Sequence, residues 1–241
     1  MIGTLINVAT VLVGTVLGVL IGGRLPERIR ETVFHGLGLL TLVLGVDNAL
    51  AAFRPPLTEL TQASGLVVVG AVLVGGVIGE AVGIERGLDR LGEFLRTRFG
   101  RGQERFTEGF VVASLLFCVG PLAILGSIRD GLTGDYQLLA VKAALDGFAA
   151  MAFASALGWG VGFSALVVLV YQGGLSLGAS VFAGVLADPA DPIIAGMTAA
   201  GGVLIMGIAL RLLDLRQVRV ANFLPALVLA PAAFAIIDRM A

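Results

Sequence analysis

A lysine and an aspartate lie one helical turn apart inside an apolar segment of this sequence. Lys142 and Asp146 belong to "LLAVKAALDGFAAMAFASALG", residues 138–158, and Lys142 is the only lysine of the chain. Because residues four apart share one face of a helix, the two charges can neutralise each other. The pair can equally line a polar path, in which a proton or a cation competes with the ammonium for the carboxylate. A lysine suits that second role, since it can lose its charge when buried whereas an arginine effectively cannot.

Other polar side chains also fall within apolar segments. An ionisable group at membrane depth costs about 2.5–3.5 kcal/mol, so it is expected to face a cavity or a partner. Carboxylates without histidine or cysteine neighbours suit protons and hard cations. We therefore predict an ion- or substrate-binding site formed among Asp47, Asn48, Glu80, Pro121, Lys142, Asp146, Tyr171 and Gln172. Further polar residues within or at the ends of such segments are Asn7, Glu108 and Asn222.

Two segments near these residues look interrupted. In "CVGPLAILG" Pro121 follows Gly120, and in "YQGGLSLG" two adjacent glycines follow Gln172. Proline removes one helical hydrogen bond and kinks or ends a helix. Broken helices within a membrane are tolerated where they line a cavity, and a pair of them is a pointer to the binding site of a transporter. The alternative is a kink that only shapes packing, and both interpretations stay open.

Several classes of site are excluded by composition and motif. The chain has one cysteine and one histidine, which rules out a disulfide framework and a Cys/His metal cluster. It has no nucleophile motif and no phosphate loop, and "DGLTGD" lacks the ligand spacing of a calcium loop. No basic surface with interleaved aromatic residues suggests nucleic acid. We expect neither an enzyme nor a bound cofactor.

The elements that would position the polar residues are membrane spans. The 241 residues are 57% hydrophobic and 14% charged, whereas a soluble domain is about 25% charged. Eight apolar segments approach the ~20 residues that cross the hydrocarbon. They are 2–23, 33–53, 64–84, 107–128, 136–157, 160–186, 192–213 and 220–238. We predict an all-α polytopic membrane helix bundle forming a single integral-membrane domain, 1–241. A seven-span arrangement with one re-entrant segment is the alternative.

The arginines are concentrated in the loops that follow odd-numbered segments. These are Arg24, Arg28 and Arg30, then Arg86, Arg90, Arg96, Arg98, Arg101 and Arg105, and finally Arg211, Arg216 and Arg219. Cytoplasmic loops carry an excess of arginine and lysine, so both termini are expected on the extracytoplasmic side. The first segment lacks a basic leader and a cleavage site, and is interpreted as a retained span.

The third loop has its own pattern. Over residues 85–105, Leu88, Leu91, Leu95 and Phe99 recur at spacings of three and four, with arginines between them. This predicts an amphipathic helix at the cytoplasmic interface. It either connects two spans, with its arginines snorkelling, or forms a lipid- or partner-binding surface that includes Arg96, Arg98 and Arg101.

An internal similarity links two of the spans. "VLVGTVLG" (11–18) and "VLVGGVIG" (72–79) agree at six of eight positions. Small residues at this spacing let helix backbones approach closely. The similarity indicates either an internal repeat, as in many transporters, or a shared glycine-rich composition.

Three stretches carry a family resemblance: "CVGPLAILGSIRDGLTGD", "KAALDGFAAMAFASALGWGVG" and "YQGGL". Together with the N-terminal "GTLINVATVLVGTVLGVLIGGRLP", they resemble the bacterial membrane-protein family known as domain of unknown function 554. The resemblance covers nearly the whole chain. It implies a multi-pass protein of the bacterial inner membrane, and it supplies no substrate and no catalytic residues.

The expected function is that of a small transporter or channel for a cation, a proton or a small charged solute. The alternative is a membrane scaffold that does not transport and that binds a partner or anionic lipid through its arginine-rich third loop. Besides the bilayer, a second copy of the chain is a plausible partner, because the small-residue stripes can pack between protomers as well as within one.

Overall fold

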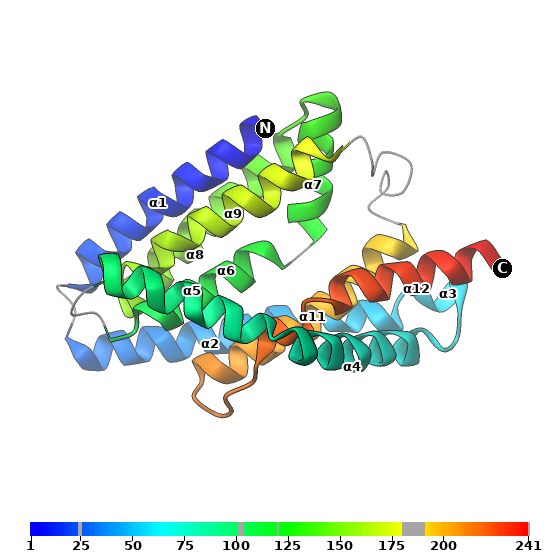
Figure 1. The fold of residues 1–241 in the computed structure, drawn as a ribbon, viewed down its shortest axis with the longest axis horizontal. Coiled ribbons are helices and arrows are strands. Elements are labelled where there is room, and N and C mark those ends of the chain that lie inside the picture. The colour runs from blue at the N-terminus through cyan, green and yellow to red at the C-terminus, as the bar shows by residue number, and fades with distance from the viewer. Residues whose placement is uncertain (24–25, 101–103, 120, 180–190, 241) are drawn as a thin grey trace. The chain divides into compact units, whose positions relative to one another are not determined.

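The computed structural model describes the chain except for residues 24–25, 101–103, 120, 180–190 and 241. All regular elements of the described residues are helices (Figure 1). They are α1 (Ile2–Gly22), α2 (Glu27–Ala49), η1 (Leu50–Phe53), α3 (Leu57–Leu60), α4 (Ser64–Val82), α5 (Ile84–Phe99), α6 (Phe106–Cys118), α7 (Pro121–Thr133), α8 (Gln137–Leu157), α9 (Gly160–Leu177), α11 (Pro192–Leu212), η2 (Val220–Phe223) and α12 (Ala226–Met240).

The helices confirm the prediction of a polytopic membrane bundle. Seven helical segments within the described residues are long and apolar enough to cross a membrane, and there are eight if the bent pair of α6 and α7 forms one span. Each of the eight predicted segments coincides with one of these, although residues 180–186 of the sixth lie outside the described part. The eighth begins with η2, before Pro225, and continues as α12, which carries Pro231 inside it.

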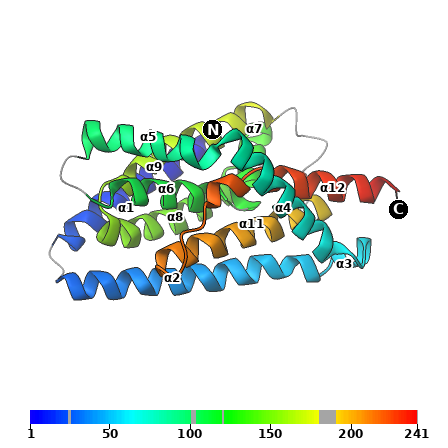
Figure 2. The same ribbon diagram turned by 60° about the horizontal axis from the view of Figure 1, so that its bottom comes forward.

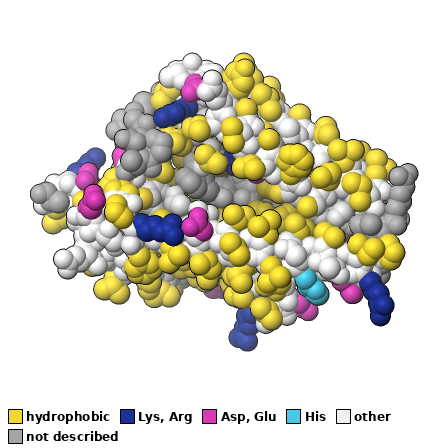
Figure 3. Space-filling model, turned by 180° about the vertical axis from the view of Figure 1, so that it is seen from behind, with side chains coloured by type: hydrophobic (Ala, Val, Ile, Leu, Met, Phe, Trp, Pro, Cys, Tyr) yellow, Lys and Arg dark blue, Asp and Glu magenta, His cyan; other side chains and the backbone are white. Residues whose placement is uncertain are grey.

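Large hydrophobic side chains cover much of the surface. Figure 3 shows them over most of the visible face, with charged groups scattered between them. Exposed examples are Leu66, Val77, Phe148, Val170 and Val228. An apolar outer surface of this extent is what contact with lipid requires, because the hydrocarbon offers no partner for polar groups.

The chain divides into two compact units. The first comprises Met1–Leu37 and Leu88–Val185, and the second Gly38–Gly87 and Leu186–Ala241. Each unit is therefore built from two separate stretches of sequence. The expectation of one integral-membrane domain over 1–241 stays a prediction.

In the first unit, α1 and α8 lie side by side along their length (Figure 1). A Cβ added at Gly14, Gly18 or Gly22 of α1 would collide with a main-chain carbonyl oxygen of α8. The carbonyl groups belong to Gly147, Met151 and Ser155, which shows that the two helices run parallel. α9 packs on α1 in the opposite direction, with Gly162 against Thr15. The glycines thus bring the backbones of α1 and α8 into close contact.

In the second unit, α4, α11, α12 and the second half of α2 pack together. Figure 2 shows α11 beside α2, and Gly202 of α11 faces the main chain at Asn48 and Ala49. Gly75 and Gly79 of α4 contact the main chain of Ala226 and Asn222 in the same way. The apolar core of this unit includes Leu57, Val68, Ala199, Ala230 and Phe234.

The two similar sequence stretches therefore have the same role in the two units. Gly14 and Gly18 of α1 lie against α8, and their equivalents in α4 lie against the start of α12 (Gly75) and against η2 (Gly79). Both pairs permit a helix approach that any larger residue would prevent. The packing explains the repeated pattern, and a repeat relationship between the two units stays a prediction.

Of the two predicted interruptions, one is present. α6 ends at Cys118, α7 begins at Pro121, and the two helices are bent by 63°. Gly120 lies outside the described residues. The second prediction was wrong, because α9 continues without a break through Gly173 and Gly174. A glycine lowers helix stability by about 1 kcal/mol relative to alanine but keeps its N–H, so packing can hold it in a helix, whereas proline has no N–H to donate.

Candidate functional site

The bend between α6 and α7 leaves the main-chain carbonyl group of Phe117 without its helical donor. In a continuous helix the N–H of residue 121 would donate to the carbonyl oxygen of residue 117. Pro121 has no N–H, so the carbonyl group of Phe117 loses that donor. Instead, the ammonium group of Lys142 donates to the Phe117 oxygen, at 2.8 Å. The single lysine of α8 thus compensates for a proline in a neighbouring span.

The same ammonium group pairs with the carboxylate of Asp146, one turn along α8. Oδ2 of Asp146 also accepts a hydrogen bond from Nδ2 of Asn7, at 2.9 Å. That nitrogen donates a second time, to Oε1 of Gln172 on α9, at 3.2 Å. Lys142, Asp146, Asn7 and Gln172 therefore form one continuous hydrogen-bonded group, which we term the polar cluster. Its members, with the Phe117 oxygen, come from α1, α6, α8 and α9.

The polar cluster is deeply buried. Asn7 and Gln172 are 0% exposed, Lys142 is 6% and Asp146 is 8%. Oδ1 of Asn7, Nε2 of Gln172 and the hydroxyl oxygen of Ser114 on α6 are buried and find no hydrogen-bond partner among the described residues. A buried polar group without a partner costs about 1–3 kcal/mol. The cluster consequently retains one acceptor and one donor that a bound molecule or ion with its water could satisfy.

The charges of the cluster balance. An ammonium and a carboxylate, each removed from water, attract strongly, but the desolvation of both offsets much of that attraction. Removing one partner leaves the other as an uncompensated buried charge. A proton or cation that binds Asp146 would therefore also weaken the ion pair between Asp146 and Lys142. The arrangement couples occupancy of one carboxylate to the contacts of the bend.

A second polar contact joins α1 to α7, the helix that follows the bend. The carboxylate of Asp130 on α7 is buried, and its Oδ2 accepts a hydrogen bond from the N–H of Gly3 at 3.0 Å. A carboxylate at the start of a helix is favourable because the first N–H groups have no partner within the helix. Ser176 of α9 donates to the carbonyl oxygen of Ser127 at 2.9 Å. Both halves of the broken span are thus fixed to their neighbours by polar contacts.

Three of the predicted site residues come together here, and a fourth creates the geometry. Lys142, Asp146 and Gln172 belong to the polar cluster, and Pro121 leaves the Phe117 carbonyl group available. Tyr171 precedes Gln172 on α9 and is half-buried.

The other predicted site residues belong to the second unit. Asp47 is exposed and forms an ion pair with Arg54, with 3.2 Å between Oδ1 and Nη1. Asn48 is half-buried beside it on α2. An exposed pair of this kind contributes little to stability. Their role in ion binding stays a prediction.

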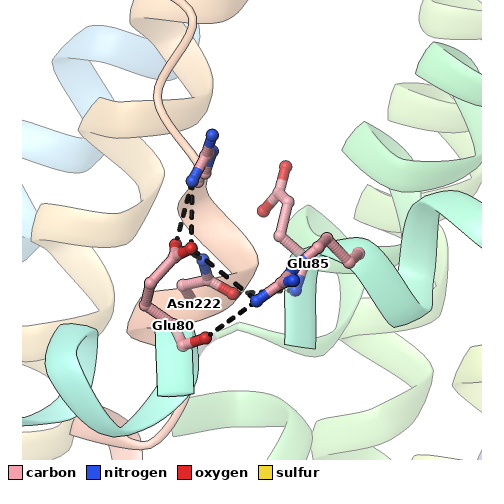
Figure 4. Close-up of polar contacts among 5 residues, drawn as sticks. Glu80, Glu85 and Asn222 are labelled. Carbon is pink, nitrogen blue, oxygen red and sulfur yellow. Dashed lines mark hydrogen bonds and ion pairs between the residues drawn. The ribbon is translucent and has the colours of Figure 1, made fainter. Parts of the chain in front are cut away.

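Glu80 belongs to a further polar group of the second unit, where α4 meets η2 (Figure 4). Its carboxylate accepts hydrogen bonds from Nη1 of Arg219, at 3.0 and 3.2 Å, and from Nδ2 of Asn222, at 2.6 Å. Nearby, the buried Glu85 pairs with Arg211 at 2.7 Å and accepts from the N–H of Ala221 at 2.6 Å. Arg211 in the last turn of α11 therefore meets Glu85 of α5, and Arg219 after α11 meets Glu80 of α4. Among the described residues, no group of three His, Cys, Asp or Glu side chains could hold a metal ion.

Over residues 2–235 the sequence matches the family described as "Protein of unknown function (DUF554)". The chain belongs to this family. It is 34% identical over 234 residues to the "Uncharacterized protein YqgA" of Escherichia coli (strain K12), covering 95% of this chain and 94% of that protein. It is 27% identical over 237 residues to the "Uncharacterized membrane protein YdfK" of Bacillus subtilis (strain 168), covering 98% of this chain and 97% of that protein. No solved structure matches the chain.

These findings confirm the resemblance seen in the sequence. The family match extends over both units of this chain. The Bacillus protein is named as a membrane protein, in agreement with the apolar helices of this chain.

Two members of the site were not predicted as such: Asn7 was noted as a polar residue within an apolar segment but not assigned to the site, and the Phe117 oxygen was not considered. Asn7 is the only side-chain amide in its span, which has no charged residue, and that was the available signal. The Phe117 oxygen could have been found by counting four residues back from Pro121. Neither observation reveals which helices are neighbours, so the assembly of the cluster required the fold.

Proposed function

We propose that this protein is a small membrane transporter or channel, and that the polar cluster of the first unit binds its cargo. The cargo is a proton, a cation or a small charged solute. The observation that carries the proposal is the Lys142–Asp146 pair, buried among four spans beside a broken helix. Ionisable side chains within a membrane bundle are costly and typically line ion or substrate pathways.

The contacts of the cluster suggest how binding would act. Lys142 holds Asp146 and the Phe117 carbonyl oxygen together, so a cation or proton on the carboxylate would release the ammonium group. The Phe117 oxygen, from which the ammonium group would be released, lies at the bend between α6 and α7. Two helix ends meet there without a continuous series of helical hydrogen bonds. A bend of this kind is a natural place for a conformational change that exposes the site to one side and then the other.

Purified protein in liposomes provides the test, with flux of protons and a panel of monovalent ions and small charged solutes measured against empty vesicles. Asp146→Asn should reduce the flux at least tenfold, because the amide cannot exchange a proton or balance a cation. Asp238→Asn is the matched control, since Asp238 is exposed in the last turn of α12. Flux equal to that of empty vesicles across the panel, from folded protein, would refute the proposal.

A different observation favours the alternative of a scaffold. α5 exposes Leu91, Phe94 and Phe99, and its last turn carries Arg96 and Arg98. Leu95 is buried and Gly92 lies against Phe110, so only part of its apolar face is covered. Such a surface could bind anionic lipid or a partner. Arg101, which was predicted to belong to it, lies outside the described residues.

The two functions differ in which residues they need. If α5 is the functional element, replacing Arg96, Arg98 and Arg101 together by glutamine abolishes activity in cells, and Asp146→Asn has no effect. If the cluster is the functional element, the pattern is reversed. The placement of α5 at the cytoplasmic interface is part of this second proposal.

We further propose that the protein lies in the bacterial inner membrane, with the arginine-rich ends of the spans in the cytoplasm and both termini outside. The support is the arginine bias of the loops. Single cysteines at Thr61 and at Arg216, in a Cys118→Ala background, would be labelled in intact cells with a membrane-impermeant maleimide. Only the cysteine at position 61 should react before the membrane is permeabilised, and the reverse pattern would invert the proposed orientation.

A further inference from the structure

A carboxylate in the last turn of α4 holds two exposed arginines. Arg219 reaches Glu80 through Nη1, at 3.0 and 3.2 Å. Nη2 of Arg86 lies 3.9 Å from Oε1 of Glu80 and donates to its main-chain oxygen at 3.3 Å. Each guanidinium group thus uses a single nitrogen for Glu80, and the structure describes no other hydrogen bond or ion pair for either.

The charge at this place is unbalanced. Two guanidinium groups face one carboxylate, so the group formed by Glu80, Arg86 and Arg219 carries a net charge of +1. The side chains of Arg86 and Arg219 are 65% and 70% exposed, so their remaining donors are accessible. Glu85 and Arg211, close by, form a separate buried pair. The exposed group is therefore complementary to an anion.

An apolar hollow lies directly beside this charge. It has a volume of about 670 Å³ and is lined by Leu73, Gly76, Val77, Glu80, Ala81, Arg86 and Phe223. The side chains of Leu73 and Val77 are exposed along α4, two turns and one turn before Glu80 respectively. The absence of a side chain at Gly76 lets the ring of Phe223 pack against α4 and form the wall. The hollow is polar at its Glu80 end and apolar towards the middle of the span.

Asn222 fixes the position of the carboxylate. Its Nδ2 donates to Glu80 at 2.6 Å, and its Oδ1 accepts from the N–H of Glu85 at 2.8 Å (Figure 4). Glu80 is thereby held at the end of α4 independently of the two arginines. This matters for a binding site, because the arginines can turn towards a ligand without loss of the contact that closes α4 onto η2.

We propose that this hollow binds an anionic phospholipid. The phosphate lies at Arg86 and Arg219, and an acyl chain lies along Leu73 and Val77. Guanidinium groups bind phosphate oxygens through two parallel hydrogen bonds, and basic pockets between membrane helices recognise anionic headgroups. Glu80 limits the affinity, since it neutralises one of the two positive charges. The site lies in the second unit and does not depend on the transport proposal.

Native mass spectrometry of the delipidated, detergent-solubilised protein measures the binding. Phosphatidylglycerol should bind at least fivefold more tightly than phosphatidylcholine of the same chain length. Arg86→Gln should weaken phosphatidylglycerol about fivefold, the loss expected for one cation near an anionic lipid surface. Arg54→Gln, in an exposed ion pair of the same unit, is the control and should change nothing.

Glu80→Gln distinguishes a binding role from a structural one. It keeps an oxygen for Asn222 and removes the negative charge, so phosphatidylglycerol should bind about fivefold more tightly. A structural role alone predicts weaker or unchanged binding in this variant. The proposal would be overturned by equal affinity for the two lipids or by an unaffected Arg86→Gln variant. It would also be overturned by full displacement of phosphatidylglycerol with millimolar inorganic phosphate, because that result would assign the arginines to free phosphate.

Discussion

The ammonium nitrogen of Lys142 lies 2.8 Å from the carbonyl oxygen of Phe117, the oxygen that Pro121 leaves without its helical donor. A lysine fits this place better than an arginine, because its compact ammonium group carries three donors directed apart from one another. One donor satisfies Phe117 and another satisfies Asp146. The only lysine of the chain therefore links a broken span to the buried carboxylate.

Removal of one charge of the pair should destabilise the protein more than removal of both. Lys142→Met leaves Asp146 as an uncompensated buried charge, and we expect a loss of about 3–5 kcal/mol in unfolding free energy. The double variant Lys142→Met/Asp146→Leu should recover most of this loss. Thermal unfolding in detergent, followed by tryptophan fluorescence of Trp159, provides the measurement.

The same double variant separates stability from activity. If the cluster binds the cargo, the double variant is stable and does not transport. If the pair is only a structural contact, the double variant transports like the native protein. A loss in the double variant equal to the sum of the losses in Lys142→Met and Asp146→Leu would show that the two charges do not interact.

Pro121→Ala should stabilise the protein and impair its activity. The substitution supplies an N–H at position 121, which can donate to the Phe117 oxygen and continue α6 into α7. Lys142 would then lose an acceptor, and the bend of 63° would decrease. Spin labels on the half-buried Thr107 of α6 and the exposed Thr133 of α7 should report a longer distance, and flux should fall. An unchanged distance would mean that packing, rather than the proline, maintains the bend.

The sequence allowed much of the fold to be predicted, and less of the site. Spans could be located because each must be apolar over ~20 residues, which is a local property. The pairing of Lys142 with Asp146 is local as well, since it follows from one helical turn. The contacts of Asp146 with Asn7 and of Asn7 with Gln172 depend on which helices are neighbours. Nothing in the sequence places Asp47 in a different unit from Asp146.

Glu93 on α5 should titrate below the ordinary range of a glutamate. A hydrogen bond from Arg96, with Nε 2.8 Å from Oε2, lowers the pKa of this carboxyl group below 4.5. Its contribution to stability is therefore present above the pKa of the unfolded chain and is lost as pH falls through the lower, folded value. Because both side chains lie at the surface, where solvent screens their interaction, the effect on unfolding should be too small to detect.

The local titration is measurable by NMR of the protein labelled at glutamate side chains. The midpoint of Glu93 should lie below 4.5 and should return towards it in Arg96→Gln. Thr107, which also donates to Glu93, provides the control, because Thr107→Ala should produce a smaller return. An Arg96→Gln spectrum with an unchanged midpoint would contradict the contact.

The glycines at which two main chains meet should tolerate no added methyl group. Gly14→Ala would place a Cβ against the carbonyl oxygen of Gly147, and Gly79→Ala would place one against that of Asn222. We expect each to cost about 1–3 kcal/mol of unfolding free energy, because the helices must separate.

The matched controls are Gly174→Ala in α9 and Gly70→Ala in α4, where a Cβ meets nothing within 4 Å. An alanine at these open positions should stabilise by about 0.4–1 kcal/mol, since it restricts the unfolded chain. If Gly14→Ala and Gly79→Ala behaved like these controls, the close approach of α1 to α8 and of α4 to η2 would be disproved.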